Sequence, residues 1–332
     1  MNIDHLIPAY KYGKPVITGS GVDGTYNRRA VDCPTVFTHN GKFYMMHIGF
    51  DGDGYQTALS TSDDLLNWEL KGTILKRGAN MQWDRVGMAG TTLLMDKDLY
   101  GGNHLKKWNG KYWLLYHAYP DFGYEAGPAE VGLAWTEDEE LLDWHFHGEP
   151  VFSWRGGAAW ECGGLYKIDL VQHEDKFYLF YNAKDVTDGS WTEQTGAAVS
   201  DDLIRWTRLP GPILPVTGGA WDSVFASDPV VLFDAGENRW AGFYFGFNGK
   251  NAMDGIAFSD DLLHWTKYPD PIIRNGAEGE LDSRHAHKPG ILWHNGTLYH
   301  FYCACRPTLT DDERERFGDE FRTITVARST PW

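Results

Sequence analysis

The stretch SDDLLNW at 62–68 recurs as SDDLIRW at 200–206 and SDDLLHW at 259–265, and a looser copy, TEDEELLDW, lies at 136–144. The closing tryptophans are 76, 62 and 59 residues apart. A period of this size predicts a repeat architecture. Ser and Asp side chains at such positions bond nearby backbone N–H groups, so each copy is expected to be a tight turn whose Trp is a packing residue.

Each unit also contains an aromatic strand that follows a tight turn. The five copies read NGKFYMMHIGF, NGKYWLLYHAY, EDKFYLFYNAK, ENRWAGFYFGF and NGTLYHFYCAC. Asn-Gly between two apolar runs is a strong hairpin signal. A short strand such as TALSTS or TGAAVS comes next, then the repeated turn, then an outer strand read as GTIL, EPVF, GPIL or DPII. Four short strands in each of five units predict an all-β chain folded as a five-bladed β-propeller.

The two ends of the chain are expected to meet in one blade. The fifth unit stops at VARSTPW, where another turn would begin, and GKPVI at 13–17 matches GEPVF and PDPII. The N-terminal strand is therefore predicted to complete the last blade and close the ring, which removes exposed strand edges. No Pro/Ser-rich linker or low-complexity tract interrupts the pattern, so we expect a single domain over 1–332.

Composition narrows the function classes. The 332 residues include 38 Gly, 15 Trp, 17 Tyr and 17 Phe, and the net charge of −16 argues against nucleic acid or an anionic membrane as partner. The four cysteines form neither a paired zinc pattern nor a disulfide framework. No signal-peptide pattern or membrane-length apolar run is present. These features predict a cytoplasmic enzyme with reduced thiols, and they leave its oligomeric state open.

Three carboxylates stand where inner strands begin: Asp32 in RRAVDCPTVF, Glu161 in AWECGG and Asp228 in FASDPVV. The long loops that lead into the inner strands favour a site on that face of the disc. Glycoside cleavage needs one carboxylic acid to protonate the leaving oxygen and a second carboxylate to attack or activate water. We therefore predict that Asp32, Glu161 and Asp228 are catalytic.

At these residues the chain resembles the five-bladed glycosidase clan that includes glycoside hydrolase families 43, 32, 62, 68, 117 and 130. WEC at 160–162 resembles the acid/base motif of family 32, and SDP at 227–229 resembles its Arg-Asp-Pro motif. The resemblance implies that Glu161 is the proton donor, Asp228 the transition-state stabiliser and Asp32 the nucleophile or base. The two motifs occur in the opposite order here, so the chain resembles an unassigned relative, closest in style to families 43 and 117.

Two alternatives bear on the identity of the acid. QWDR, AWEC and AWDS look like one repeated loop feature, in which Glu161 matches Asp84, Asp222 and Asp282 as a structural carboxylate. A fifth-blade histidine, His285 or His287, is the other candidate acid, because histidine titrates near the required pKa. The HAH triplet is only weak evidence for a metal site. We expect no metal and no cofactor, with a structural divalent ion near the central channel as the alternative.

Further residues are predicted to bind substrate from the loops at the same mouth. They are Trp160, Asp84, Lys184, His285, His287, Lys288 and Arg306.

Three functions fit this pattern. The first is an exo-acting glycosidase that cleaves a terminal sugar from short oligosaccharides. The second is a phosphorylase resembling family 130, in which Lys288, Lys167, Arg29 and His287 would bind phosphate. The third is a non-catalytic propeller that binds sugar or protein.

Overall fold

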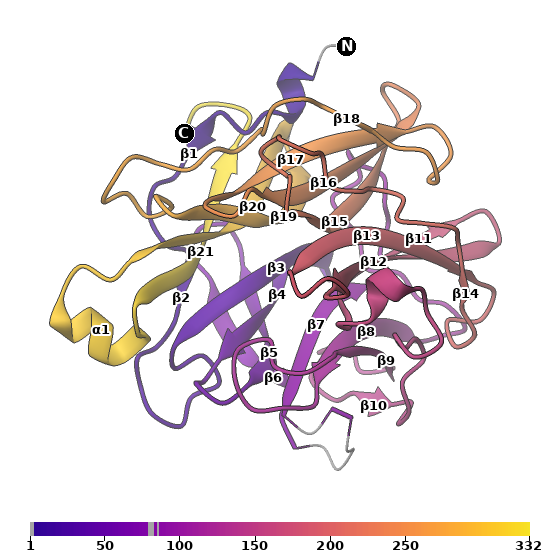
Figure 1. The fold of residues 1–332 in the computed structure, drawn as a ribbon, viewed down its shortest axis with the longest axis horizontal. Coiled ribbons are helices and arrows are strands. Elements are labelled where there is room, and N and C mark those ends of the chain that lie inside the picture. The colour runs from indigo at the N-terminus through magenta and orange to yellow at the C-terminus, as the bar shows by residue number, and fades with distance from the viewer. Residues whose placement is uncertain (1–2, 79–82, 85) are drawn as a thin grey trace.

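The computed structural model describes residues 3–78, 83–84 and 86–332, and these fold into blades of antiparallel strands around a central axis (Figure 1). Short parallel pairs, β13 with β15 and β17 with β19, link the last three blades into one continuous sheet. Neighbouring inner strands contact one another around the whole ring, in the order β3, β7, β11, β15, β19 and back to β3. The predicted five-bladed β-propeller is therefore confirmed.

The strands of the first two blades are β3 (Ala30–His39), β4 (Lys42–Phe50), β5 (Tyr55–Ser62), β6 (Glu69–Leu75), β7 (Gly87–Leu93), β8 (Tyr112–Tyr119), β9 (Glu130–Thr136) and β10 (His145–Phe146). Those of the third and fourth are β11 (Leu165–His173), β12 (Lys176–Asp185), β13 (Thr192–Ser200), β14 (Thr207–Arg208), β15 (Phe225–Asp234), β16 (Arg239–Phe247), β17 (Ala252–Ser259) and β18 (Thr266–Lys267). The fifth contains β19 (His285–His294), β20 (Thr297–Pro307) and β21 (Glu320–Arg328).

The N-terminal segment completes the fifth blade. Strands β1 (Tyr10–Lys11) and β2 (Ile17–Thr18) both pair with β21, and the Val16 N–H donates to the Ile324 carbonyl at 2.8 Å. The predicted closure of the ring by the N-terminal strand is confirmed. Within the described residues, the helical elements are the single turns η1 (Asp4–Leu6) and η2 (Ala159–Glu161) and the short helix α1 (Asp311–Phe317).

The repeated turn forms as its sequence indicates. In the copy at 200–206, Ser200 Oγ accepts from the N–H groups of Asp202 and Leu203, and the Asp202 carboxylate accepts from the two N–H groups that follow. Leu203 is buried at φ +64°, and its carbonyl accepts from Trp206 Nε1 at 3.0 Å. The same Trp-to-Leu bond occurs in the other three copies. The turn is therefore a self-contained unit of the scaffold.

The outer strands differ from the prediction in three blades. Only GTIL lies within a fourth strand, β6. EPVF, GPIL and DPII instead form isolated bridges through Phe152, Leu214 and Ile273. The fourth strands β10, β14 and β18 come directly after the turn tryptophan and are two residues long. Each of the three displaced segments carries a proline, which has no N–H to donate to a strand ladder.

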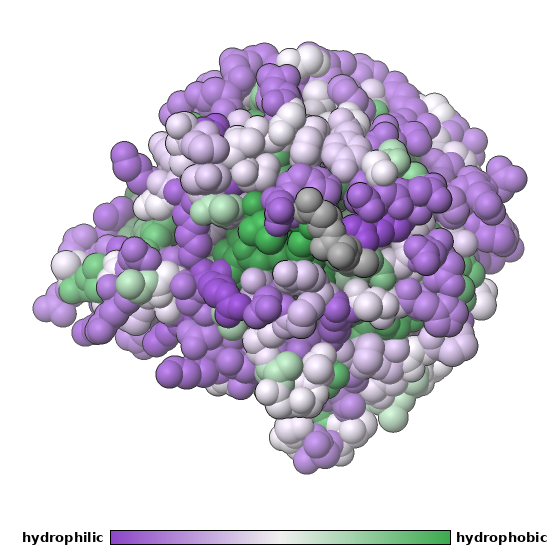
Figure 2. Space-filling view, turned by 90° about the horizontal axis from the view of Figure 1, so that it is seen from above, coloured by the Kyte–Doolittle hydropathy of each residue, from purple (hydrophilic) through white to green (hydrophobic). Residues whose placement is uncertain are grey.

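The surface is mostly hydrophilic on the face seen in Figure 2. Figure 2 shows hydrophilic residues over most of one face, with apolar residues visible in a hollow near its middle. Among the described residues, the helices are too short and too polar to cross a bilayer.

Candidate active site

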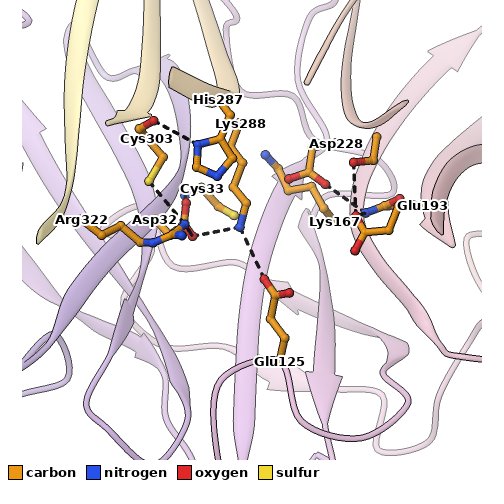
Figure 3. A network of polar contacts seen from close by, with 12 residues as sticks. Asp32, Cys33, Glu125, Lys167, Glu193, Asp228, His287, Lys288, Cys303 and Arg322 are labelled. Atoms are coloured by element: carbon orange, nitrogen blue, oxygen red, sulfur yellow. Dashed lines mark hydrogen bonds and ion pairs between the residues drawn. The ribbon is translucent and has the colours of Figure 1, made fainter. Parts of the chain in front are cut away.

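A cavity of about 390 Å³ is lined by residues from all five blades. This volume lies in the roughly 300–1,000 Å³ range of small-molecule sites. Its charged lining residues are Glu125, Lys167, Glu193, Asp228, Lys288 and Arg322, and its histidines are His117, His285 and His287. Acids and cations thus meet at the centre of the ring (Figure 3).

Bulges in the inner strands bring several of these side chains to the axis. The pairing register of β3, β11, β15 and β19 shifts near its start, and the residue at the shift has a left-handed backbone. These residues are Cys33 (φ +50°), Lys167 (φ +24°), Asp228 (φ +53°) and Lys288 (φ +65°). A bulge re-aims a side chain and is common beside active sites. The same position in four blades therefore faces one cavity. It carries a thiol in one blade, a carboxyl group in another and an amine in the other two.

Glu193 and Asp228 are held side by side by one amide. Asn182 Nδ2 donates to Glu193 Oε2 at 2.7 Å and to Asp228 Oδ1 at 3.2 Å, and Trp191 Nε1 donates to Glu193 Oε1 at 2.8 Å. Burial raises the pKa of Glu193 to about 7, and the charges of Glu125 and Asp228 add to the rise. Burial likewise raises the pKa of Asp228 to about 6, against the opposing charges of Lys167 and Lys288. Glu193 is therefore suited to donate a proton near neutral pH.

Glu125 and Asp32 share a lysine. Lys288 Nζ lies 2.9 Å from Asp32 Oδ2 and 3.5 Å from Glu125 Oε1, and Arg322 Nη1 donates to Asp32 Oδ2 at 2.9 Å. Burial acts to raise the pKa of Asp32, but Lys288 and Arg322 hold it well below the usual range. Asp32 lies behind the cavity wall and keeps two cavity cations in place, whereas Glu125 lines the cavity itself. Asp32 therefore positions Lys288 and Arg322 in this structure, and its catalytic role stays a prediction.

Lys167 presents an unusual group to the cavity. Its side chain is buried, and within the described part of the chain Nζ has no hydrogen-bond partner. A buried ammonium without acceptors is costly. An oxygen-rich ligand in the cavity would supply these acceptors.

The histidines of the fifth blade are placed as predicted but are poor acids. His285 and His287 both line the cavity. Burial lowers the pKa of His285 to about 4 and that of His287 well below its ordinary value. These lowered pKa values favour neutral rings at pH 7 and so support Glu193 over either histidine as the acid, while the histidine hypothesis stays a prediction. Each remains a candidate substrate contact, as does Lys288.

Glu161 is predicted from the sequence to be catalytic, but the structure places it away from the cavity. It lies outside the cavity lining, fully buried, and accepts from Tyr181 Oη at 2.5 Å and from Arg208 Nε at 3.0 Å. Asp222 and Asp282 repeat this pattern in other blades: Tyr244 and Tyr302 donate to them, and Lys267 and Lys11 pair with them. Glu161 is thus one copy of the structural loop carboxylate, the alternative that the repeated loop sequence had left open.

Asp84 and Trp160 belong to the same repeated feature and not to the cavity lining. Burial raises the pKa of Asp84 to about 6, against a hydrogen bond with Tyr116, the tyrosine of its own blade. Trp160 stacks on Tyr181 at an interplanar angle of 14°, as Trp83 stacks on Tyr116 at 19°. Asp84 and Trp160 therefore contact the tyrosines of their own blades, and neither lines the cavity.

The last two predicted contacts also differ from expectation. Arg306 is held by Glu313 through two hydrogen bonds of 2.8 and 2.7 Å, so it ties α1 to β20 and lies outside the cavity lining. Lys184 lies beyond the lining as well, with Nζ 3.3 Å from the centre of the Trp191 ring, but Trp191 does line the cavity. Lys184 therefore stays near the mouth, without a place in the wall itself.

The sequence reasoning missed Glu125 and Glu193 as acids. Glu125 lies in the loop between β8 and β9, within YPDFGYEAGPAE, and Glu193 is the second residue of β13, near the end of AKDVTDGSWTEQ, which the sequence predicts as a loop. An acid beside an aromatic residue in such a loop, as in GYE and SWTE, is the only sequence signal for them. Many exposed loop acids share it, so it does not identify a site.

Fold and site together define a five-bladed β-propeller with paired carboxylates in its central cavity. Residues 168–310 match the model of the glycosyl hydrolases family 32 N-terminal domain, less than half of the chain. That segment holds Glu193, Asp228 and Lys288.

Two curated proteins of Thermoanaerobacter sp. (strain X514) are similar in sequence. A 1,2-beta-oligomannan phosphorylase is 27% identical over 163 residues, covering 47% of this chain and 44% of that protein. A beta-1,2-mannobiose phosphorylase is 24% identical over 161 residues, covering 44% of this chain and 52% of that protein. The match spans about half the length of these relatives.

Solved structures match along nearly the whole chain. A BT0996 RGII complex has a TM-score of 0.81 and 29% identity, covering 98% of this chain and 94% of that one. Two further structures share the fold. A thermostable family-43 glycoside hydrolase has a TM-score of 0.65 and 17% identity, covering 94% of this chain and 92% of that one. Zg3597, a family 117 glycoside hydrolase of Zobellia galactanivorans, has a TM-score of 0.63 and 13% identity, covering 93% of this chain and 87% of that one. By its fold, and by the family match over part of its length, the chain is similar to the five-bladed β-propeller glycoside hydrolases.

Proposed function

We propose that this chain is an exo-acting glycoside hydrolase whose general acid is Glu193. The observation that carries the proposal is the raised pKa of the Glu193 carboxyl inside the cavity. It lines the cavity, and burial with two neighbouring acids raises its pKa to about 7. A carboxylic acid that stays protonated near neutrality beside ionised carboxylates is what glycosidic oxygen protonation requires.

Glu125 is proposed as the second carboxylate of the reaction. It lines the cavity, is ion-paired to Lys288 at 3.5 Å (Figure 3), and its charge contributes to the raised pKa of Glu193. In the proposed reaction the Glu193 proton passes to the glycosidic oxygen as the bond to the sugar breaks. Glu125 then attacks the anomeric carbon or takes a proton from the attacking water. Asp228 raises the pKa of Glu193 through its charge.

The shape of the cavity supports cleavage at a chain end. Tyr124, which precedes Glu125, packs against Phe50 and Tyr55 with ring centroids 5.6 and 5.7 Å apart, so this loop forms a wall. Trp191 and Phe225 line another side. A walled cavity of this volume suits one terminal sugar of a short oligosaccharide. With reduced cysteines, this substrate also fits the predicted cytoplasmic location.

Phosphate-dependent cleavage is a second candidate, for a specific reason. Both curated relatives are named as phosphorylases, and Lys167 and Lys288 supply buried cations to the cavity. Arg29, by contrast, lies outside this cavity and donates to the Glu315 carbonyl at 2.7 Å.

The test is product release from aryl glycosides and short oligosaccharides, furanosides and pyranosides alike, with and without phosphate. Wild type should release free sugar in both conditions. Glu193→Gln should lower kcat/KM on oligosaccharides by about 10²–10⁴-fold, and far less on aryl glycosides with acidic leaving groups, which need no proton. Glu161→Gln is the matched control and should stay within a few-fold of wild type.

Each other outcome has a meaning. Sugar phosphate formed only with phosphate would assign the phosphorylase function. Sugar binding without turnover on any substrate would favour the non-catalytic propeller. An unchanged kcat/KM for Glu193→Gln would remove Glu193 as the acid. Rescue of Glu125→Ala by azide, with a glycosyl azide as product, would identify Glu125 as a nucleophile.

A further inference from the structure

Three buried side chains form a cluster at the cavity to which the proposed acid and base chemistry assigns no role. The ligand atoms of His287, Cys303 and Cys305 all lie within 4.8 Å of one another. The two Sγ atoms are 3.9 Å apart, and both thiols are free. Figure 3 shows His287 and Cys303 on neighbouring strands at the edge of the site.

The register of the fifth blade creates this cluster. His287 pairs with Cys303 across β19 and β20, and Cys305 lies two residues further along β20. Side chains alternate between the faces of a strand, so Cys303 and Cys305 point the same way. The cluster is thus built into regular strands and not into a loop.

The two cysteines are badly placed for a disulfide. Residues two apart in a strand are separated by about 6.6 Å along it, with parallel side chains. A disulfide needs Cβ atoms about 3.5–4.5 Å apart. Closing one here would distort β20, which pairs with β19 on one side and β21 on the other.

We propose that His287, Cys303 and Cys305 form a binding site for a thiophilic divalent cation such as Zn²⁺, with a fourth position open to the cavity. Two thiolates about 2.3 Å from one tetrahedral zinc lie about 3.8 Å apart, close to the Sγ–Sγ distance of 3.9 Å. Nδ1 of His287 is 3.2 Å from the Cys303 carbonyl. A histidine anchored to a carbonyl in this way offers its other nitrogen to a metal.

The charges around the cluster also permit a divalent cation to bind there. Arg322 and Lys288 lie nearby, with Asp32 between them. Binding Zn²⁺ converts two thiols to thiolates and releases two protons to solvent, so the net charge of the cluster does not change. Arg322 Nη1 is 3.8 Å from Cys303 Sγ and can donate to the thiolate. His287 lines the cavity, which gives the ion a route to the buried thiols.

The test is zinc binding by the reduced full chain, and it is independent of catalysis. Native mass spectrometry and a chelator competition should show one Zn²⁺ per chain. Cys303→Ser, Cys305→Ser and His287→Asn should each weaken binding by at least about 100-fold, more than the loss of an outer partner costs. Cys162→Ser and His285→Asn keep the cluster and should bind as wild type does.

Two further readouts separate a lost ligand from a lost fold. Cobalt(II) in wild type should give thiolate-to-metal charge-transfer absorption that is absent in Cys305→Ser, while the circular dichroism of that variant stays native. Bound zinc should protect two thiols from alkylation. Wild type that binds no zinc, or serine variants that bind it equally well, would overturn the proposal.

Discussion

Lys288 of the fifth blade donates to Asp32 of the first, with Nζ 2.9 Å from Oδ2, so the contact joins the two blades where the ring closes. Both side chains are buried. Asp32 also accepts from Arg322, so one carboxylate is paired with two cations.

Asp32→Asn should therefore destabilise the fold. It would remove the carboxylate shared by Lys288 and Arg322 and leave them only Glu125 at 3.5 Å and Glu320 at 2.9 Å. Breaking a buried pair costs about 3–5 kcal/mol of the free energy of unfolding. Denaturant unfolding measures this. Asp63→Asn is the control, because its ion pair with Lys42 is exposed and 3.7 Å long, and it should change stability by less than about 0.5 kcal/mol. Equal stability of the two variants would contradict the prediction.

The pH dependence of activity should report Glu193. The acid must be protonated to work, so kcat/KM should fall as pH rises through about 7, the pKa to which burial and the neighbouring charges raise this side chain. The charge of Asp228 contributes to that rise. In Asp228→Asn the pKa of Glu193 should drop, and the basic limb of the profile should move to lower pH. If the basic limb of the kcat/KM profile lies at the same pH in Asp228→Asn and in wild type, another group is the acid.

Lys167→Met should lower the activity without lowering the melting temperature. The ammonium is buried without a hydrogen-bond partner within the described structure, so an apolar side chain of similar length should leave the melting temperature equal or higher. Activity should fall, because Lys167 opposes the burial that raises the pKa of Asp228 and is available to contact substrate oxygens. Lys184→Met, at the mouth, is the comparison and should affect activity less. A lower melting temperature with full activity would argue for a purely structural Lys167.

The repeated turn should depend on its second aspartate. The Asp202 carboxylate accepts from the Ile204 and Arg205 N–H groups at 3.0 and 2.8 Å. Losing such a cap costs about 0.5–2 kcal/mol, so Asp202→Ala should lower the free energy of unfolding by that amount. Its neighbour Asp201 is exposed and makes one surface pair with Lys176, and Asp201→Ala should be nearly neutral. Similar effects of both substitutions would mean that the turn is not held by these bonds.

The sequence by itself determined the scaffold, including the closure of the ring by the N-terminal segment. Turns and alternating strands follow from contacts between residues close in the chain, and those contacts recur from blade to blade. It also placed Asp228, His285, His287 and Lys288 at the cavity, since the starts of the inner strands meet at the axis in any propeller.

Only the tertiary structure decided which acids face the cavity. Glu161 and Glu193 are both buried glutamates of the third blade, but Tyr181 and Arg208 hold the first while the second reaches the cavity. The path of a long loop and the depth of burial depend on contacts between blades, which no local pattern encodes. The same contacts raise the pKa of Glu193 and lower that of Asp32. The chemistry of the site is therefore a property of the assembled ring.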